Sequence, residues 1–282
     1  MSSIRVPTLV GLALLVGLGL VVGYTGAAAQ ERLLPPVRSF ELPEASPRVH
    51  GLVGRLISAR RGDSRFGREH EGEVVLGENF PLVSLQGGRR PIVLGFGSQV
   101  YGRFSLTDPK SALISTDWVV GINTTAVLSS WALTLELYHE SSHLGDEYGD
   151  RFPADRLDWT REVLAGWASY AAGVWRFTAG ASYVLDDQLR LPAPGGSLGV
   201  DFHGRSRRGL TGQVRPIAGV FIQADAATSW RVSSSAKLGV AFATGDSHDI
   251  SLGLIAHDGL STQRQFFRQE SQYIGMELRF DL

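Results

Sequence analysis

The sequence predicts an all-β protein, a transmembrane antiparallel β-barrel of about 12 strands, and three observations support this prediction. Apolar and polar residues alternate with period two in segment after segment, as they do when successive side chains of a strand point to opposite faces. One face of each segment is apolar, and the other mixes small residues with charges of both signs. That division suits an apolar outer wall around a polar lumen. An export signal at the N-terminus agrees with it.

Residues 1–29 are predicted to be this export signal. A single positive charge at Arg5 precedes an apolar run from Leu9 to Val22, and the small residues Ala27, Ala28 and Ala29 follow. We therefore expect cleavage after Ala29. The apolar run is too short and too rich in glycine for a spanning helix, which needs roughly 20 apolar residues.

The mature chain is predicted to have two parts. Residues 30–47 contain Pro35, Pro36, Pro43 and Pro47, which favour an extended periplasmic lead-in. Residues 48–282 are expected to form the barrel.

The alternation that predicts the strands is clearest in the last one, residues 274–282. Its apolar face consists of Ile274, Met276, Leu278, Phe280 and Leu282, and its other face of Gly275, Glu277, Arg279 and Asp281. The same scheme recurs at 92–106, 114–126, 131–141 and 175–185, and more weakly at 198–202, 218–226, 232–242 and 250–256. In the 114–126 segment the apolar face starts at Ile114. With candidates at 48–58, 73–86 and 157–171 the count reaches about 12, an even number as in single-chain bacterial barrels.

The predicted connections alternate in length. With both termini in the periplasm, the long connections 58–73, 140–158, 186–196 and 258–272 become extracellular, while 86–90, 129–130 and 171–173 are short periplasmic turns. The connection 204–215 is longer than this scheme expects. Because acidic and basic residues are nearly equal in number, the lumen is predicted to be polar and filled by paired side chains.

Composition excludes several function classes. The chain has 27 Lys and Arg against 28 Asp and Glu, so there is no basic excess to indicate nucleic-acid binding. It has no cysteine, which excludes disulfides, a lipid-anchored cysteine and thiol chemistry. The expected partner is a lipid bilayer, and the sequence leaves the oligomeric state open.

The segment 137–151, LYHESSHLGDEYGDR, carries the densest set of reactive side chains. One interpretation is architectural: His139, His143, Asp146, Glu147 and Asp150 would form a polar network at the barrel rim that fixes the extracellular loop.

A second interpretation is catalytic. His139 and Ser141 continue the outward phase of the strand, so they are expected roughly 7 Å apart on the lipid side. His139 would be the general base for Ser141, and an acid, Asp146, Asp155 or Asp158, would orient the imidazole. We take Asp155 as the candidate. The substrate would be an acyl ester of phospholipid or lipopolysaccharide.

A third interpretation involves a metal. HESSH matches the zinc-protease pattern H-E-x-x-H, with Glu140 as base and Glu162 as a third ligand. That pattern works only on a helix, and the period of two argues against one here. A non-catalytic metal site of His143, Asp146 and Glu147, with His139 as a further ligand, stays open, with calcium or no cofactor as the alternatives.

Three stretches resemble the family catalogued as domain of unknown function 1207, found in exported bacterial proteins. They are STDWVVGIN at 115–123, LYHESSHLGDEYGDRF at 137–152 and HDGLSTQRQFFRQESQYIGMELRFDL at 257–282, within a resemblance over 56–282. The resemblance implies an outer-membrane β-barrel but no activity. The family more often has Gln at the position of Glu140, which argues against a zinc protease.

The H-x-S spacing of His139 and Ser141 also resembles that of outer-membrane phospholipase A and the lipid A deacylases. The phospholipase pattern continues with Asn, where this chain has Ser142. Two functions therefore remain: a lipid or lipopolysaccharide acyl hydrolase, or a non-enzymatic barrel that is a narrow channel or a structural and interaction protein. The hydrolase needs Ser141 on the outer wall near His139, and a channel needs an open path past Glu136, Arg176 and Glu277.

Overall fold

The computed structural model describes residues 30–35, 40–61, 70–87, 90–108, 110–152, 156–209, 212–243 and 249–280. The predicted export signal, including the cleavage site after Ala29, lies outside these ranges. No helix in the described part of the chain is long and apolar enough to cross a membrane.

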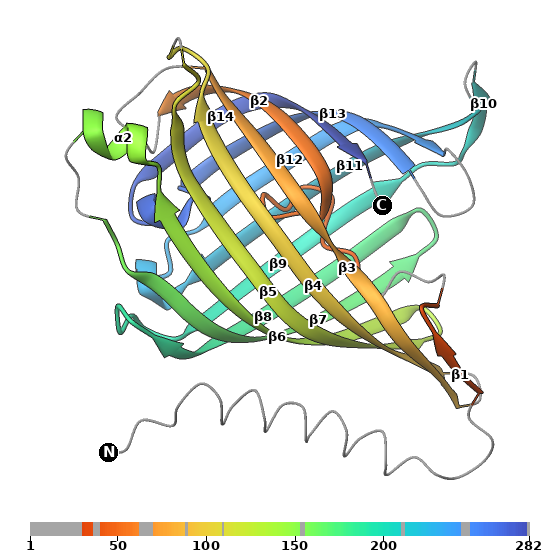
Figure 1. The fold of residues 1–282 in the computed structure, drawn as a ribbon. Coiled ribbons are helices and arrows are strands. Elements are labelled where there is room, and N and C mark those ends of the chain that lie inside the picture. Colours follow the sequence, from red (N-terminus) through yellow and green to blue (C-terminus); the bar gives the residue numbers. More distant parts are fainter. Residues whose placement is uncertain are drawn as a thin grey trace, which may run out of the picture.

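The fold is a closed antiparallel β-barrel of 12 strands (Figure 1), which confirms the predicted fold class. Each strand pairs with the next along the chain, and β14 pairs with β2 to close the sheet. The strands are β2 (Gly51–Arg61), β3 (His70–Gly87), β4 (Arg90–Ser105), β5 (Leu113–Leu128), β6 (Trp131–Leu144), β7 (Trp159–Ala172), β8 (Trp175–Asp187), β9 (Pro194–His203), β11 (Gly212–Asp225), β12 (Ser233–Ala243), β13 (Asp249–Leu260) and β14 (Glu270–Phe280).

Five short elements lie outside the 12 barrel strands in the described part of the chain. Strand β1 (Gln30–Leu33) pairs with the end of β3 that extends past β2, and β10 (Arg207–Gly209) extends the sheet beside β11. Helix α2 (Asp146–Arg151) lies in the β6–β7 loop, η1 (Ala226–Thr228) follows β11, and η2 (Arg264–Phe266) lies in the β13–β14 loop. We call the end of the barrel with the β6–β7, β8–β9 and β13–β14 loops the loop end.

Side chains alternate between the two faces of the wall, as the period of two predicts. On β6, Trp131, Leu133 and Leu135 are exposed on the outside, whereas Thr134 and Glu140 are buried on the inside. Ile114 is an exception: it was predicted to face outward but is fully buried. The β4–β5 register shifts at Arg103/Phe104, and Ile114 packs in a cluster with Tyr148 of α2 and Phe266 of η2.

Paired charges fill part of the lumen, as predicted. Arg55 contacts Glu73 at 2.5 Å and Glu277 at 2.7 Å, and Lys237 contacts Glu277 at 2.8 Å. Arg103 forms two further ion pairs on the same side of the barrel. All of these side chains are almost fully buried, so each charge depends on its partner to offset the cost of leaving water.

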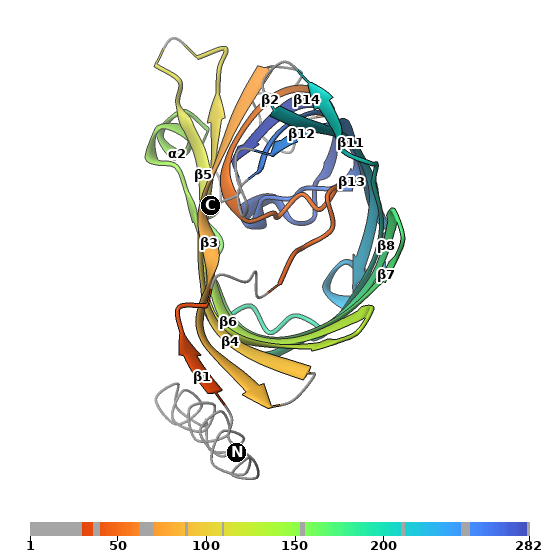
Figure 2. The ribbon, with the colours of Figure 1, turned by 90° about the vertical axis from the view of Figure 1, so that its right-hand side faces the viewer.

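Residues 40–50, which we call the N-terminal segment, run through the inside of the barrel, where Figure 2 shows this orange segment within the ring of strands. Phe40, Ala45 and Val49 are buried there. The predicted periplasmic lead-in, residues 30–47, is therefore wrong for residues 40–47. The physical reason is charge pairing across the lumen: Glu44 contacts Lys237 at 3.1 Å, and its backbone N–H donates to Asp201 at 2.9 Å.

Candidate active site

Strand β6 divides the 139–143 motif between two faces. His139, Ser141 and His143 continue the outward series of Leu133, Leu135 and Leu137, whereas Glu140 and Ser142 point into the lumen and are buried. The predicted outward position of His139 and Ser141 is therefore where the structure places them. The zinc-protease geometry is absent, because β6 is a strand and Glu140 lies on the opposite face from both histidines.

An acid on the next strand holds His139. The Nδ1 atom of His139 lies 2.8 Å from Oε1 of Glu162, which is directly opposite it in the β6–β7 register. A carboxylate can only accept, so Nδ1 carries the proton and donates it. The side chains are 38% and 18% exposed, so the pair lies at the surface of the wall but is partly covered.

The acids predicted to orient His139 are elsewhere. Asp146 pairs with Arg156 at 2.8 Å, and Asp158 accepts a hydrogen bond from Thr160 at 3.3 Å. Asp155, the candidate chosen from the sequence, lies outside the described residues. From the sequence, Glu162 is a candidate only as a zinc ligand. One signal could have identified it: its charge stands on the outward face of β7, between Thr160 and the apolar Leu164.

Ser141 lies one step further along the same face of β6. Its cross-strand neighbours are Trp118 on β5 and Thr160 on β7, and its side chain is partly exposed. No hydrogen bond joins Ser141 to His139 within the described residues, and residues two apart on a strand are roughly 7 Å apart. With Nδ1 bound by Glu162, Nε2 is the ring nitrogen that can accept a proton from the serine. Such contacts are often long before substrate binds.

Around His139 and Ser141, the residues on the outer face of the barrel change from apolar to polar in the direction of the loop end. Val120 stands opposite His139, and Trp118, half exposed, stands opposite Ser141. Leu137 and Leu164 face each other on the side away from the loops. Towards the loop end, His143, Asp146 and Glu147 are exposed. The pair thus lies at the edge of the apolar band that barrels of this type present to lipid.

The two inward residues of the 139–143 motif, Glu140 and Ser142, bind other parts of the chain inside the barrel. Glu140 accepts hydrogen bonds from Arg48 at 3.0 Å, from Arg264 at 2.9 Å and from the Trp159 indole at 3.1 Å. Ser142 donates to Asp117 at 2.5 Å, and Asp117 also binds Arg48 at 2.7 Å. These contacts attach the N-terminal segment and the β13–β14 loop to the inside of the wall, directly behind the outward pair.

The predicted metal ligands do not converge. His143 is exposed at the end of β6, and Asp146 and Glu147 occupy the exposed first turn of α2. Across the described ranges no three His, Asp or Glu side chains gather where they could hold a metal ion. Asp146 has an arginine as its partner instead. This metal site remains a prediction from the sequence.

The path that a channel would need is occupied. Arg176 is bound to Asp201 at 2.9 Å and to Glu41 of the N-terminal segment at 2.8 Å. Glu136 accepts a hydrogen bond from the Trp167 indole at 2.8 Å, and Phe40 packs against the same indole. Segment 40–50 therefore lies across the route past these residues.

Comparison with known proteins agrees with the fold. The profile of the family described as proteins of unknown function (DUF1207) matches residues 39–282. No curated protein matches the chain. Among solved structures it is similar to outer membrane phospholipase A from Escherichia coli, with 14% identity and a TM-score of 0.57, over 85% of this chain and 91% of that one.

Two related structures give the same result. The Salmonella typhi outer membrane phospholipase dimer with bound calcium has 13% identity and a TM-score of 0.56, over 85% of this chain and 92% of that one. An active-site mutant of the Escherichia coli enzyme, in which an asparagine is replaced by alanine, has 13% identity and a TM-score of 0.59, over 88% and 93%. At these identities the likeness shows the fold alone, that of bacterial outer-membrane barrels.

Proposed function

Because the chain belongs to the DUF1207 family, whose description gives no activity, we propose its function from the site itself: an outer-membrane lipid acyl hydrolase. Ser141 is the nucleophile, His139 the general base and Glu162 the acid that orients the imidazole. The observation that carries the proposal is the 2.8 Å contact between His139 Nδ1 and Glu162, on the outer face of the wall and one step from Ser141.

The chemistry follows from the protonation that this contact imposes. Nε2 of His139 takes the proton of the Ser141 hydroxyl as Oγ attacks the ester carbonyl carbon. The tetrahedral intermediate collapses when the imidazolium gives that proton to the leaving alcohol, and an acyl-enzyme remains. Water, activated by the same nitrogen, then releases the fatty acid and restores Ser141. Glu162 stabilises the imidazolium in both steps.

The position of the site supports a lipid substrate. An ester in the outer leaflet would reach Ser141 by lateral diffusion, with its chains along the apolar band and its headgroup towards the loop end. Trp118 lies beside Ser141, and tryptophan is enriched at the membrane–water interface, so Ser141 is expected at the depth of the lipid ester groups. Phospholipid and lipopolysaccharide both present acyl esters there. The fold shared with proteins named as phospholipases agrees with this substrate class.

Fatty-acid release by the purified, refolded protein tests the proposal. We expect the wild type to release fatty acid from phospholipid vesicles or from lipid A, and His139→Ala to lose this activity. Parallel assays with and without calcium separate a metal-dependent from a metal-independent reaction. Equal background release by both proteins on both lipids, with folding verified by heat-modifiable migration, would refute the hydrolase.

Glu162→Ala is expected to lower kcat by about 10²- to 10⁴-fold, because the imidazole loses its orientation and the partner of its charge. Glu162→Gln should retain more activity, since an amide oxygen can still accept from Nδ1. The matched control is Asp186→Ala, which removes the acid opposite Glu162 on β8. If kcat falls equally in the Asp186 and Glu162 variants, the specific role of Glu162 is wrong.

A further inference from the structure

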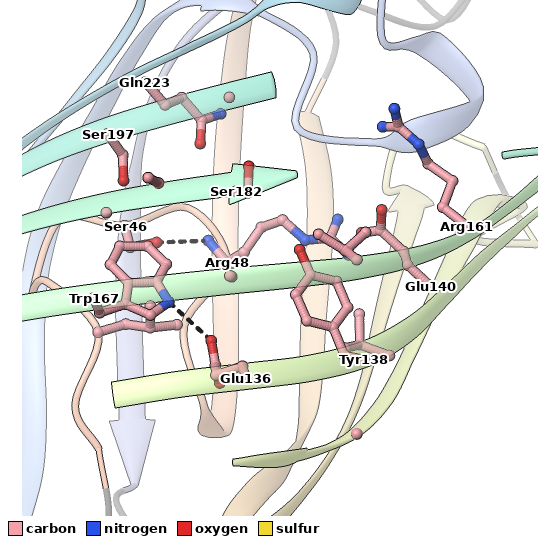
Figure 3. Close-up of a pocket in the computed structure, with 18 of the residues that line it drawn as sticks. Ser46, Arg48, Glu136, Tyr138, Glu140, Arg161, Trp167, Ser182, Ser197 and Gln223 are labelled. Atoms are coloured by element: carbon pink, nitrogen blue, oxygen red, sulfur yellow. Dashed lines mark hydrogen bonds and ion pairs between the residues drawn. The ribbon is translucent and has the colours of Figure 1, made fainter. Parts of the chain in front are cut away.

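The lumen holds a cavity of about 200 Å³ that the proposed hydrolase does not use. It is lined by the N-terminal segment and by residues of β4 to β9 and β11, and Figure 3 shows 18 of the lining residues. Ser141 faces the opposite side of the wall, so the cavity and the hydrolase site are separate.

The cavity exists because one sector of the wall has almost no side chains. The inward residues of β8 and β9 there are Gly180 and Ser182, paired with Ser197 and Gly195. Elsewhere long charged side chains fill the lumen. Position 180 must be glycine because the Trp167 ring packs directly against its backbone. A Cβ at this position would lie 2.5 Å from the ring. A larger residue at any of these positions would occupy the space.

Hydrogen-bonding groups without protein partners line this space. In the described part of the chain, no side-chain hydrogen bond is found for Tyr138, Ser182, Ser197 or Gln223, which all line the cavity and are partly exposed to it. Figure 3 places Ser182, Ser197 and Gln223 on one side and Tyr138 with Trp167 on the other. The buried Oδ1 of Asn123, also in the lining, has no partner either. The hydroxyls and the amide are partly exposed to the cavity, so they are free to bond a polar occupant in place of water, and Asn123 Oδ1 is one further acceptor.

The lining is suited to a neutral occupant rather than an ion. The charges at its edge are already engaged: Glu140 binds Arg48 and Arg264, and Glu136 accepts from Trp167. Arg161, also in the lining, pairs with Asp187 at 3.5 Å. The partly exposed groups beside the rings of Tyr138 and Trp167 include hydroxyls and an amide, which both donate and accept. At roughly 30 Å³ per water the space equals six or seven waters, close to the size of a single hexopyranose ring.

We propose that this cavity binds one neutral hexose. Pro192 and Ala193 of the β8–β9 loop belong to the lining, so the sugar enters from the loop end. Segment 40–50 closes the other side through Ser46 and Arg48. Hydroxyls of the ring bond Ser182, Ser197 and Gln223, and its apolar face packs on the aromatic side chains.

Calorimetric titration of the wild-type protein in detergent micelles with D-glucose, D-galactose and D-mannose tests the proposal. We expect saturable 1:1 binding of at least one of them with a dissociation constant below about 1 mM. D-glucuronate should bind more weakly, because the arginines of the lining, Arg48, Arg161 and Arg264, already have acidic partners. Absence of saturable binding by all three neutral sugars, or preference for a charged one, would overturn the proposal.

Variants locate the binding. Ser197→Leu fills the cavity and should weaken binding at least 10-fold, whereas Ser98→Leu, the same exchange on the outward face of β4, should leave it unchanged. Gln223→Ala is the milder variant, expected to weaken binding roughly 5- to 10-fold through one lost hydrogen bond. Unchanged affinity in folded Ser197→Leu and Gln223→Ala would overturn the assignment to this cavity. None of these readouts depends on fatty-acid release.

Discussion

Ser141→Ala is expected to abolish fatty-acid release, lowering kcat by at least about 10³-fold. Without Oγ no acyl-enzyme can form, and the His139–Glu162 pair alone has no nucleophile to activate. The substitution removes a partly exposed hydroxyl for which no hydrogen bond is found in the described residues, so the barrel should stay as stable as the wild type. The measurement is kcat on the lipid that the wild type hydrolyses.

The neighbouring serine provides the matched control. Ser142→Ala makes the same change one residue along, on the inward face, where the hydroxyl donates to Asp117. We expect it to cost about 1 kcal/mol of stability, the usual contribution of one hydrogen bond, and to leave kcat within a few-fold. If Ser142→Ala abolished activity as fully as Ser141→Ala, or if Ser141→Ala stayed active, Ser141 would not be the nucleophile.

The largest expected effect on stability comes from Glu140→Ala. This carboxylate is almost fully buried and neutralises Arg48 and Arg264, which would both lose a partner in the lumen. Breaking a buried ion pair typically destabilises a protein by about 3–5 kcal/mol. We expect a loss of this size in the free energy of unfolding, measured in urea by heat-modifiable migration.

Two further variants show whether the loss of stability comes from the buried contacts of Glu140 or from the removal of any acidic side chain. Glu140→Gln should be milder, because its amide oxygen can still accept from Arg264 or the Trp159 indole. Glu147→Ala removes an exposed acid of α2 and should leave the unfolding midpoint unchanged. A Glu140→Ala protein that unfolds at the wild-type urea concentration would contradict the anchoring role.

Periodicity explains why much of the architecture could be predicted. The outward position of His139 and Ser141 follows from alternation along a single strand, which needs no knowledge of distant contacts. The same alternation predicted that Glu136, Arg176 and Glu277 would face the lumen, and each has a partner there. Local pattern is sufficient for these features because each strand has one apolar face.

The features that could not be predicted from the sequence depend on residues far apart in the chain. Segment 40–47 looks like an extended linker, and only its pairing with Lys237 and Asp201 places it in the lumen. Glu162 meets His139 through the register of two strands separated by the loop with α2. Period two cannot reveal such a register, because the length of the loop does not determine it.

The motif around residue 140 combines an architectural role with the chemical role that we propose. The architectural role belongs to Glu140 and Ser142, which face inward, rather than to His143, Asp146 and Glu147. The chemical role is assigned to His139 and Ser141, which face outward. Because side chains alternate along the strand, the four consecutive residues 139–142 contribute to both the lumen and the outer surface.

Labelling with a long-chain fluorophosphonate tests the central claim most directly. A serine activated by an imidazole displaces the fluoride and keeps the phosphonyl group, and mass spectrometry of the digested protein locates the adduct. We predict an adduct on Ser141 in the folded wild type, none on Ser142, and loss of labelling in His139→Ala. A folded protein that gives no adduct on Ser141, or one that labels equally in His139→Ala, would contradict the account.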